Sequence, residues 1–228
     1  MQNILNWKEF STTEELQSTL LLEIEHLAKE AIKETGSFKI ILAGGTTPEK
    51  IYHAFLKFNQ TDFQNWEIFV GDERCLEPDD KNRNSQMISN AFLNHLDPVN
   101  MPKFFPIKSE LGPIDGSNDY DSLIDSYEFF DLALLGLGED GHTASLFPGH
   151  QWNPNANVIP VNNAPKPPSD RISLTPKAFS KSKKIIFIVT GKNKCIPVEN
   201  WKSEKPIPAS QIISNYPIDI YCNFNQLF

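Results

Sequence analysis

One nearly continuous apolar run, Phe129–Leu135, constrains the fold of this chain more than any other segment. A strand with one wet face alternates polar and apolar residues, whereas a run of this kind is typical of a parallel strand buried on both faces. Similar runs at Phe38–Ala43, Trp66–Val70 and Lys184–Val189 are separated by segments with helical spacing. Alternating strands and helices predict an α/β fold with three layers, in which helices flank a mostly parallel, twisted sheet.

Helix and strand signals extend along the rest of the chain. A capping box at Thr12–Glu15 begins a first helix, which Gly36 ends. Other helices are expected at Pro48–Phe58, at Ser85–Leu96, near Tyr120, at Pro176 and after Gly191; the pattern also resumes at Arg171–Leu174, and a last strand is expected at Ile218–Cys222. The stretch Pro148–Pro168, rich in proline and asparagine, is predicted to be a loop, and loops of this length are usually functional or mobile. No repeat or linker divides the pattern, which predicts a single domain over residues 1–228.

Three polar loops follow three of the predicted strands. The first is Gly44-Gly45-Thr46-Thr47, whose glycines let a ligand approach the backbone and which leads into a helix N-terminus that favours anions. The second, Asp72-Glu73-Arg74, offers carboxylates and a guanidinium. Because ligands of open α/β sheets bind at the carboxyl ends of the strands, we expect these loops to share a site with the third loop, which contains Asp140 and His142. An ordinary strand-to-helix turn and a solvated surface are the alternatives for the first two loops.

Asp140 and His142 are predicted to form a proton-transfer unit. If the segment is extended, residues two apart point to the same side, so the Asp140 carboxylate can orient the imidazole and favour its protonated form. A histidine placed in this way is a general base with a pKa near neutrality. No serine or cysteine lies in a nucleophile elbow, so water is the expected nucleophile. The alternative is a histidine that only stabilises a turn.

The same loop matches the dinucleotide-binding pattern G-x-G-x-x-G at Gly136–Gly141. That pattern should open a helix, whereas here Pro148 and a proline-rich stretch follow. A nicotinamide cofactor is therefore not expected, and no other cofactor is predicted. A metal is not expected either, since the five histidines show no paired ligand spacing.

Charge and composition limit the possible partners. The net charge of −8 and the lack of a basic run argue against nucleic acid or an anionic membrane as the main partner. No window reaches the roughly 18 apolar residues of a membrane helix, and the N-terminus lacks the regions of a signal peptide. Three cysteines without metal-ligand spacing fit reduced thiols, so a cytoplasmic protein is expected. Arg74, Arg83 and Arg171 are the only arginines of the chain, and each is either a ligand for phosphate or carboxylate or a surface residue.

Together, the loops resemble those of a known family. The segments Ala43–Pro48, Gly71–Arg74 and Gly136–Pro148 are similar to those of the 6-phosphogluconolactonases, which belong to the superfamily that includes glucosamine-6-phosphate deaminase. The likeness continues at Arg171–Thr175 and Gly191–Lys194 and thus covers nearly the whole chain. It implies a modified Rossmann-like fold of the deaminase and isomerase type. It also implies hydrolysis of 6-phosphogluconolactone in the pentose phosphate pathway, with no cofactor and with a phosphorylated sugar lactone as substrate, by a monomer or small homo-oligomer.

The resemblance assigns roles only where residues match. His142 would activate water for attack on the lactone carbonyl and then protonate the leaving ring oxygen, with Asp140 holding the ring. Arg74, Arg171 and Lys194 would hold the phosphate and the sugar acid. Substrate contacts are also expected from Gly44, Gly45, Thr46, Thr47, Asp72 and Asn84.

Two positions depart from the family's pattern. Arg83 replaces a residue that is commonly serine, and Gln211 follows Ser210 where many members have a basic residue. The competing enzyme is the deaminase, which typically has isoleucine after the histidine and tyrosine after Asp-Glu; this chain has Thr143 and Arg74 there. A non-catalytic sugar-phosphate sensor is a further alternative, although no DNA-binding segment supports it.

Overall fold

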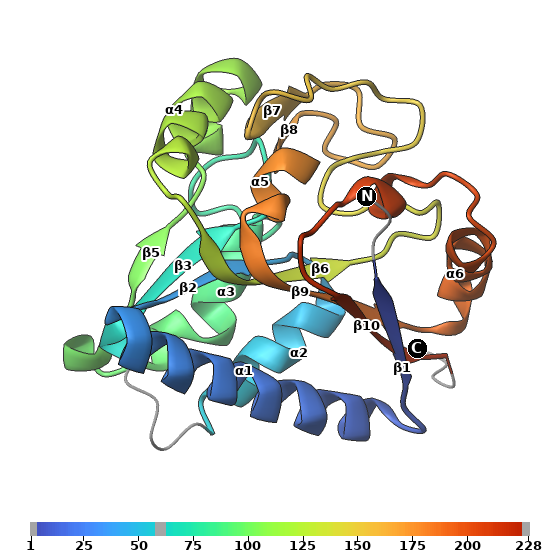
Figure 1. Ribbon diagram of the computed structural model, residues 1–228. Helices are drawn as coiled ribbons and strands as arrows, with labels where there is room; N and C mark the ends of the chain where they lie inside the picture. The colour runs from blue at the N-terminus through green and yellow to red at the C-terminus, as the bar shows by residue number, and fades with distance from the viewer. Residues whose placement is uncertain (1–3, 58–62, 225–228) are drawn as a thin grey trace.

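The central sheet consists of seven parallel strands in the order β1-β10-β9-β6-β2-β3-β5. The computed structural model (Figure 1) describes residues 4–57 and 63–224. The strands of this sheet are β1 (Leu5–Glu9), β2 (Phe38–Leu42), β3 (Trp66–Val70), β5 (Lys103–Phe105), β6 (Phe130–Gly136), β9 (Ser182–Thr190) and β10 (Ile218–Asn223). The predicted parallel α/β sheet is thereby confirmed, and the predicted strands β2, β3, β6, β9 and β10 lie within one or two residues of their expected bounds.

The strand order places a crevice at one point of the carboxyl edge. From β2 the chain runs outward through β3 to β5, and from β6 it runs the other way through β9 to β10. β2 and β6 are neighbours, so the direction of winding reverses between them. The loops that leave two such strands diverge to opposite sides, and ligands of open α/β sheets bind in the gap that results. The glycines after β2 and the histidine loop after β6 therefore flank the same crevice.

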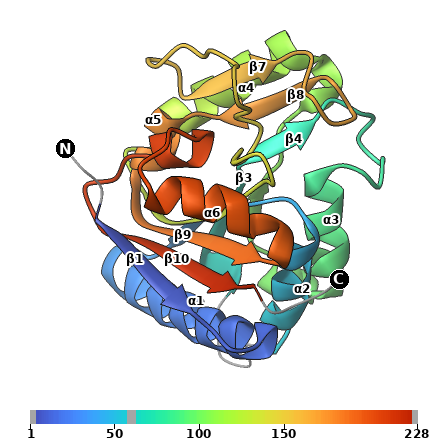
Figure 2. The ribbon, with the colours of Figure 1, turned by 90° about the vertical axis from the view of Figure 1, so that its right-hand side faces the viewer.

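Helices cover both faces of the sheet because its central strands are mostly apolar and almost entirely buried. Every residue of β3 is buried, as are all residues of β6 except Gly136. In Figure 2, α1 lies beneath the sheet, while α5 and α6 lie above it. The helices are α1 (Thr13–Thr35), α2 (Thr46–Phe55), α3 (Asn84–Ala91), α4 (Pro113–Asp125), α5 (Pro176–Ser180) and α6 (Cys195–Lys202). Single 3₁₀ turns occur at Phe63–Asn65, Leu93–His95, Pro98–Asn100, Ser109–Leu111, Lys192–Lys194 and Pro208–Gln211.

Helix ends agree with the sequence where a capping residue sets them. The Thr12 side chain accepts a hydrogen bond from the Glu15 N–H at 3.0 Å, and Gly36 ends α1 in the left-handed region with φ +83°. Two predicted helices differ from expectation. The helix expected at Pro48–Phe58 begins at Thr46 and ends at Phe55, and Phe58 lies outside the described residues. The helix expected to reach Leu96 ends at Ala91, where Phe92 leaves helical geometry.

A second sheet contains two segments that we predicted incorrectly. Its antiparallel strands are β4 (Asp72–Arg74), β8 (Arg171–Leu174) and β7 (Val158–Val161), in that order. Asp72–Arg74 is thus a short strand rather than a loop, and the predicted loop Pro148–Pro168 contains β7. These strands were missed because they are only three or four residues long. In addition, β4 is held by pairing to the distant strand β8. The pairing sets Arg74 directly opposite Arg171.

Candidate active site

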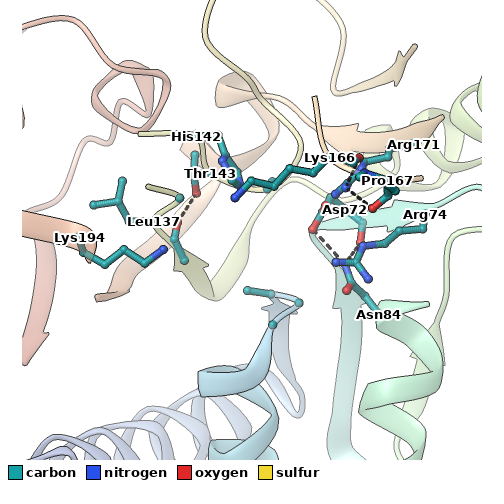
Figure 3. A pocket seen from close by; sticks show the side chains of 16 residues that line it. Asp72, Arg74, Asn84, Leu137, His142, Thr143, Lys166, Pro167, Arg171 and Lys194 are labelled. Atoms are coloured by element: carbon teal, nitrogen blue, oxygen red, sulfur yellow. Dashed lines mark hydrogen bonds between the residues drawn. The ribbon is translucent and has the colours of Figure 1, made fainter. Parts of the chain in front are cut away.

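A cavity of about 320 Å³ opens in the crevice between β2 and β6. Figure 3 shows its walls: Lys194 and Leu137 lie on one side, Arg74, Asn84 and Arg171 on the other, and His142 between them. Of the predicted site residues, the structure brings to its lining Gly44, Gly45, Asp72, Arg74, Asn84, His142, Arg171 and Lys194. Lining residues that we did not predict are Ala43, Gly136, Leu137, Gly138, Thr143, Ala144, Lys166 and Pro167.

Three predicted residues do not line the cavity. Asp140 stands behind the His142 ring. Thr46 is exposed at the start of α2, and the hydroxyl of Thr47 bonds that of Thr190 at 2.8 Å, which joins α2 to the end of β9. Both threonines lie in the first turn of α2, which begins earlier than expected, and their contact with a substrate stays a prediction.

The Asp140 carboxylate holds His142 at both its ring and its backbone. One carboxylate oxygen lies 2.5 Å from Nδ1 of the ring and 3.2 Å from the His142 backbone nitrogen. The segment is a tight turn with Gly141 at φ +84°, so the extended geometry that we expected is wrong, although the pair forms. With Nδ1–H donating to Asp140, Nε2 is the ring nitrogen left to accept a proton. The imidazole also packs against Phe147, at 4.7 Å between ring centroids.

Burial decides the charge of the imidazole. Desolvation lowers the pKa of His142 below 6.5, more than the hydrogen bond and charge of Asp140 raise it. Asp140 thus favours the protonated ring, as expected, but burial outweighs its effect on the pKa. Burial raises the pKa of Asp140, yet the hydrogen bond and charge of His142 outweigh it and hold that pKa below 3.8. Near neutral pH the unit is an ionised carboxylate beside a neutral imidazole, which is the form that a general base requires.

A pH profile follows from these shifts. A base must be unprotonated, so activity is lost as the pH falls through the pKa of His142, and the midpoint of the acid limb of kcat/KM should lie below 6.5. Asp140→Asn removes the charge that raises this pKa, so the midpoint should move further down while the rate also falls. Initial rates across the acid range test both expectations. A wild-type midpoint above 6.5 would mean that the Asp140 charge dominates after all.

The histidine loop depends on Gly138 for space, because this glycine lies against the His142 ring. Its backbone is not left-handed, so conformation is not the reason. A Cβ added at Gly138 would overlap the His142 ring, whereas a Cβ added at Gly136 would meet nothing within 4 Å. Gly138→Ala must therefore displace the imidazole, and we expect it to lower kcat about 100-fold, as misplacement of a reacting group by about 1 Å does. Gly136→Ala, at the end of β6 just before this loop, is the matched control and should stay within a few-fold of wild type. Equal rates for the two variants in a turnover assay would contradict this assignment.

Two arginines lie opposite each other in the lining of the cavity. Arg74 and Arg171 face each other across β4 and β8, and like charges directly opposite are destabilising unless something compensates them. Arg171 is buried, and this burial, with Arg74 adding to it, lowers the pKa of its guanidinium. A phosphate or carboxylate between the two forks would relieve the repulsion.

Asp72 and Asn84 form a fixed polar wall next to the arginines. The Asn84 side-chain amide donates to the Asp72 carbonyl at 2.7 Å and to its carboxylate at 3.1 Å, and the Ser145 hydroxyl donates to the other carboxylate oxygen at 2.6 Å. Gly44 is required here, because a Cβ at this position would overlap the Asn84 amide. The glycine loop thus accommodates a neighbouring side chain as well as a ligand.

The two departures from the family's pattern lie outside the cavity. Arg83 is buried and pairs with Glu110 at 2.9 Å and with Glu73 at 3.6 Å, so its task is structural. Gln211 lies in the last 3₁₀ turn and borders a different depression. The alternative of a surface arginine is wrong for Arg83, and sequence could not show this because its partners Glu73 and Glu110 lie on separate segments.

The two lining lysines add positive charge near the histidine. Burial lowers the pKa of Lys194, which follows β9. Lys166 precedes β8, and its ammonium lies 4.0 Å from the exposed Glu139 carboxylate. Cations from four separate segments therefore surround one cavity, although the chain as a whole is acidic.

Among residues 4–57 and 63–224, which the structure describes, neither a metal site nor a membrane-spanning helix occurs. In that part of the chain, no three His, Cys, Asp or Glu side chains gather in a way that could hold a metal ion. Within the same ranges, no helix has the length and apolar character needed to cross a bilayer. Cys75, Cys195 and Cys222 are free thiols.

Comparisons with known proteins agree with the motifs. Residues 11–218 match the family described as glucosamine-6-phosphate isomerases/6-phosphogluconolactonase. A probable 6-phosphogluconolactonase of Schizosaccharomyces pombe is 33% identical over 80% of this chain and 79% of its own length. A probable 6-phosphogluconolactonase of rice, named as chloroplastic, is 28% identical over 86% of this chain, which spans 66% of that protein.

Solved structures share the fold across both enzyme types. The 6-phosphogluconolactonase of Thermotoga maritima superposes with a TM-score of 0.87 at 21% identity, covering 96% of this chain and 99% of that one. A monomeric glucosamine-6-phosphate deaminase superposes with a TM-score of 0.80 at 23% identity, covering 95% and 96%. The fold alone thus does not separate the two activities. The family match and the relative at 33% identity show that the chain belongs to the glucosamine-6-phosphate isomerase and 6-phosphogluconolactonase family.

Proposed function

We propose that this chain hydrolyses 6-phosphogluconolactone to 6-phosphogluconate. The observation that carries the proposal is the His142 ring, held by Asp140 through Nδ1 and lining a cavity that is bordered by paired arginines. Its relatives named as 6-phosphogluconolactonases support the same reaction. A cytoplasmic location and a monomer or small homo-oligomer remain predictions.

The reaction needs one base that later becomes an acid. Nε2 of neutral His142 takes a proton from water as the water oxygen attacks the lactone carbonyl, which gives a tetrahedral oxyanion. When this intermediate collapses, the bond from the carbonyl carbon to the ring oxygen breaks, and the imidazolium returns the proton to that oxygen. Asp140 stays ionised throughout and fixes the ring tautomer. The products are the open-chain acid and a regenerated neutral histidine.

The arginine pair would bind the phosphate of the substrate. Arg74→Ala should raise KM about 10- to 100-fold, the range expected for a lost charge-assisted hydrogen bond, and should change kcat much less. Inorganic phosphate should also become a weaker competitive inhibitor. Lys29→Ala, on the exposed surface of α1, is a control of equal charge change. If KM and phosphate inhibition stayed at wild-type values, the phosphate would have to bind elsewhere.

Acid release from freshly generated 6-phosphogluconolactone, measured against spontaneous hydrolysis, tests the proposal directly. Acceleration by the wild-type protein supports the lactonase. Release of ammonia from glucosamine 6-phosphate without lactone hydrolysis would instead identify a deaminase. Binding of 6-phosphogluconate with neither turnover would favour a sensor.

A further inference from the structure

Lys166 extends from a segment whose backbone is fixed by Arg171. The Arg171 Nη2 donates to the carbonyls of Lys166 and Pro167 at 2.9 and 3.2 Å, and Nε donates to the carbonyl of Pro168 at 3.1 Å. A hydrogen bond of 2.8 Å from the Ala164 N–H to the Ser169 carbonyl closes the same loop. The lysine side chain therefore begins at a defined point of the cavity wall, although it lies outside any helix or strand.

The ammonium of Lys166 reaches toward the base. Figure 3 shows its side chain crossing the cavity from the arginine side to end near His142. Its positive charge lowers the pKa of His142, although less than burial does. Its acidic neighbour is Glu139, at 4.0 Å, and both side chains of that pair are more than half exposed. An exposed pair at that distance contributes little, so the ammonium is available to a ligand.

The other cations that line the cavity are Arg74, Arg171 and Lys194, and each either bonds the backbone or extends from a different wall. Arg171 donates through Nε and Nη2 to loop carbonyls, and Arg74 donates through Nη1 to the Asn82 carbonyl. These two face each other at the far wall, which suits a dianionic phosphate. Lys194 extends from the opposite wall (Figure 3). The cation that extends toward His142 from the phosphate side is Lys166.

We propose that the Lys166 ammonium donates a hydrogen bond to the lactone carbonyl oxygen and stabilises the oxyanion that forms there. This inference rests on the proposed lactonase activity. Water activated by His142 attacks the carbonyl carbon, so the oxygen that gains charge lies within a few ångströms of the base. A cationic donor at that oxygen is worth more in the transition state, where the oxygen gains charge, than in the ground state. Arg171 then has a positioning role as well, because it holds the loop from which Lys166 extends.

Lys166→Met tests the proposal, since it keeps most of the side-chain length and removes the charge. With 6-phosphogluconolactone, kcat should fall about 10²- to 10³-fold, the usual cost of losing one oxyanion donor, with KM changed only a few-fold. The midpoint of the acid limb of kcat/KM should move up, because a positive charge beside His142 is gone. Lys166→Arg should recover part of kcat. Inhibition by inorganic phosphate should stay at its wild-type strength.

The controls separate this inference from the proposed function. Lys192→Met, an exposed lysine outside the cavity, should match wild type in every measurement. A Lys166→Met protein with normal kcat but raised KM and weaker phosphate inhibition would make Lys166 a phosphate ligand and overturn the inference. Wild-type kcat with an unmoved acid limb would overturn it as well. If the wild-type protein itself failed to accelerate lactone hydrolysis, the proposed function would fail first.

Discussion

Replacing His142 by alanine should lower kcat for lactone hydrolysis by about 10²- to 10⁴-fold, the usual contribution of a positioned general base. The water would then have to attack without a proton acceptor, and the departing ring oxygen would have to leave without a proton donor. KM should change little, because the arginines on β4 and β8 that we propose as phosphate ligands are unchanged. The fold should persist, since the ring lines a cavity and is not part of the packed core.

His150 provides a matched control for this variant. Both imidazoles pack against Phe147, with ring centroids at 4.7 Å for His142 and 5.8 Å for His150, but only His142 lines the cavity. His150→Ala should therefore keep nearly full turnover. Rates must be corrected for spontaneous hydrolysis of the lactone, which sets the lowest rate that can be measured. Wild-type turnover in His142→Ala would refute the mechanism even with the family membership intact.

The sequence predicted the centre of the fold better than its edges. β3 and β6 are buried on both faces, and continuous apolar runs mark such strands. The strands β1 and β5 lie at the two edges of the sheet and carry mixed residues, so neither was predicted. β4 was missed because its partner β8 lies far along the chain, and β7 because it is a short strand within a proline-rich stretch.

The site residues divide in the same way. Some could be placed from their position after a strand, and others depend on contacts between distant segments. Residues on loops directly after central strands, such as Gly44 and His142, could be placed in one cavity from the parallel order alone. Lys166 could not, because it reaches the cavity only through the contacts between Arg171 and its loop. A signal was available, since a lysine within a proline-rich stretch just before Arg171 lies close to a predicted site residue. The lowered pKa of His142 also depends on burial, which spacing does not report.

Of the segment Asp72-Glu73-Arg74, Glu73 should contribute most to the stability of the fold. Its side chain is fully buried, and its carboxylate accepts hydrogen bonds from the backbone nitrogens of Arg74 at 2.9 Å, Asn84 at 2.6 Å and Ser85 at 2.8 Å. Two of these nitrogens belong to the first turn of α3, whose capping position is filled by Arg83 without a side-chain cap. The Glu73 carboxylate therefore caps α3 from the neighbouring strand β4. It also lies 3.6 Å from the buried Arg83 guanidinium.

Glu73→Ala should lower the free energy of unfolding by about 3–5 kcal/mol, because it leaves a buried cation with one partner fewer and several buried N–H groups with none. Glu73→Gln keeps the shape and one acceptor oxygen, so a loss of about 1–3 kcal/mol is expected. Urea unfolding followed by circular dichroism measures both, with Glu199→Ala on the exposed side of α6 expected within about 0.5 kcal/mol of wild type. A Glu73→Ala protein as stable as the control would mean that α3 and Asn84 are held without this carboxylate. If the expectation holds, the proposed substrate contacts of Arg74 and Asn84 depend on one buried side chain that does not line the cavity.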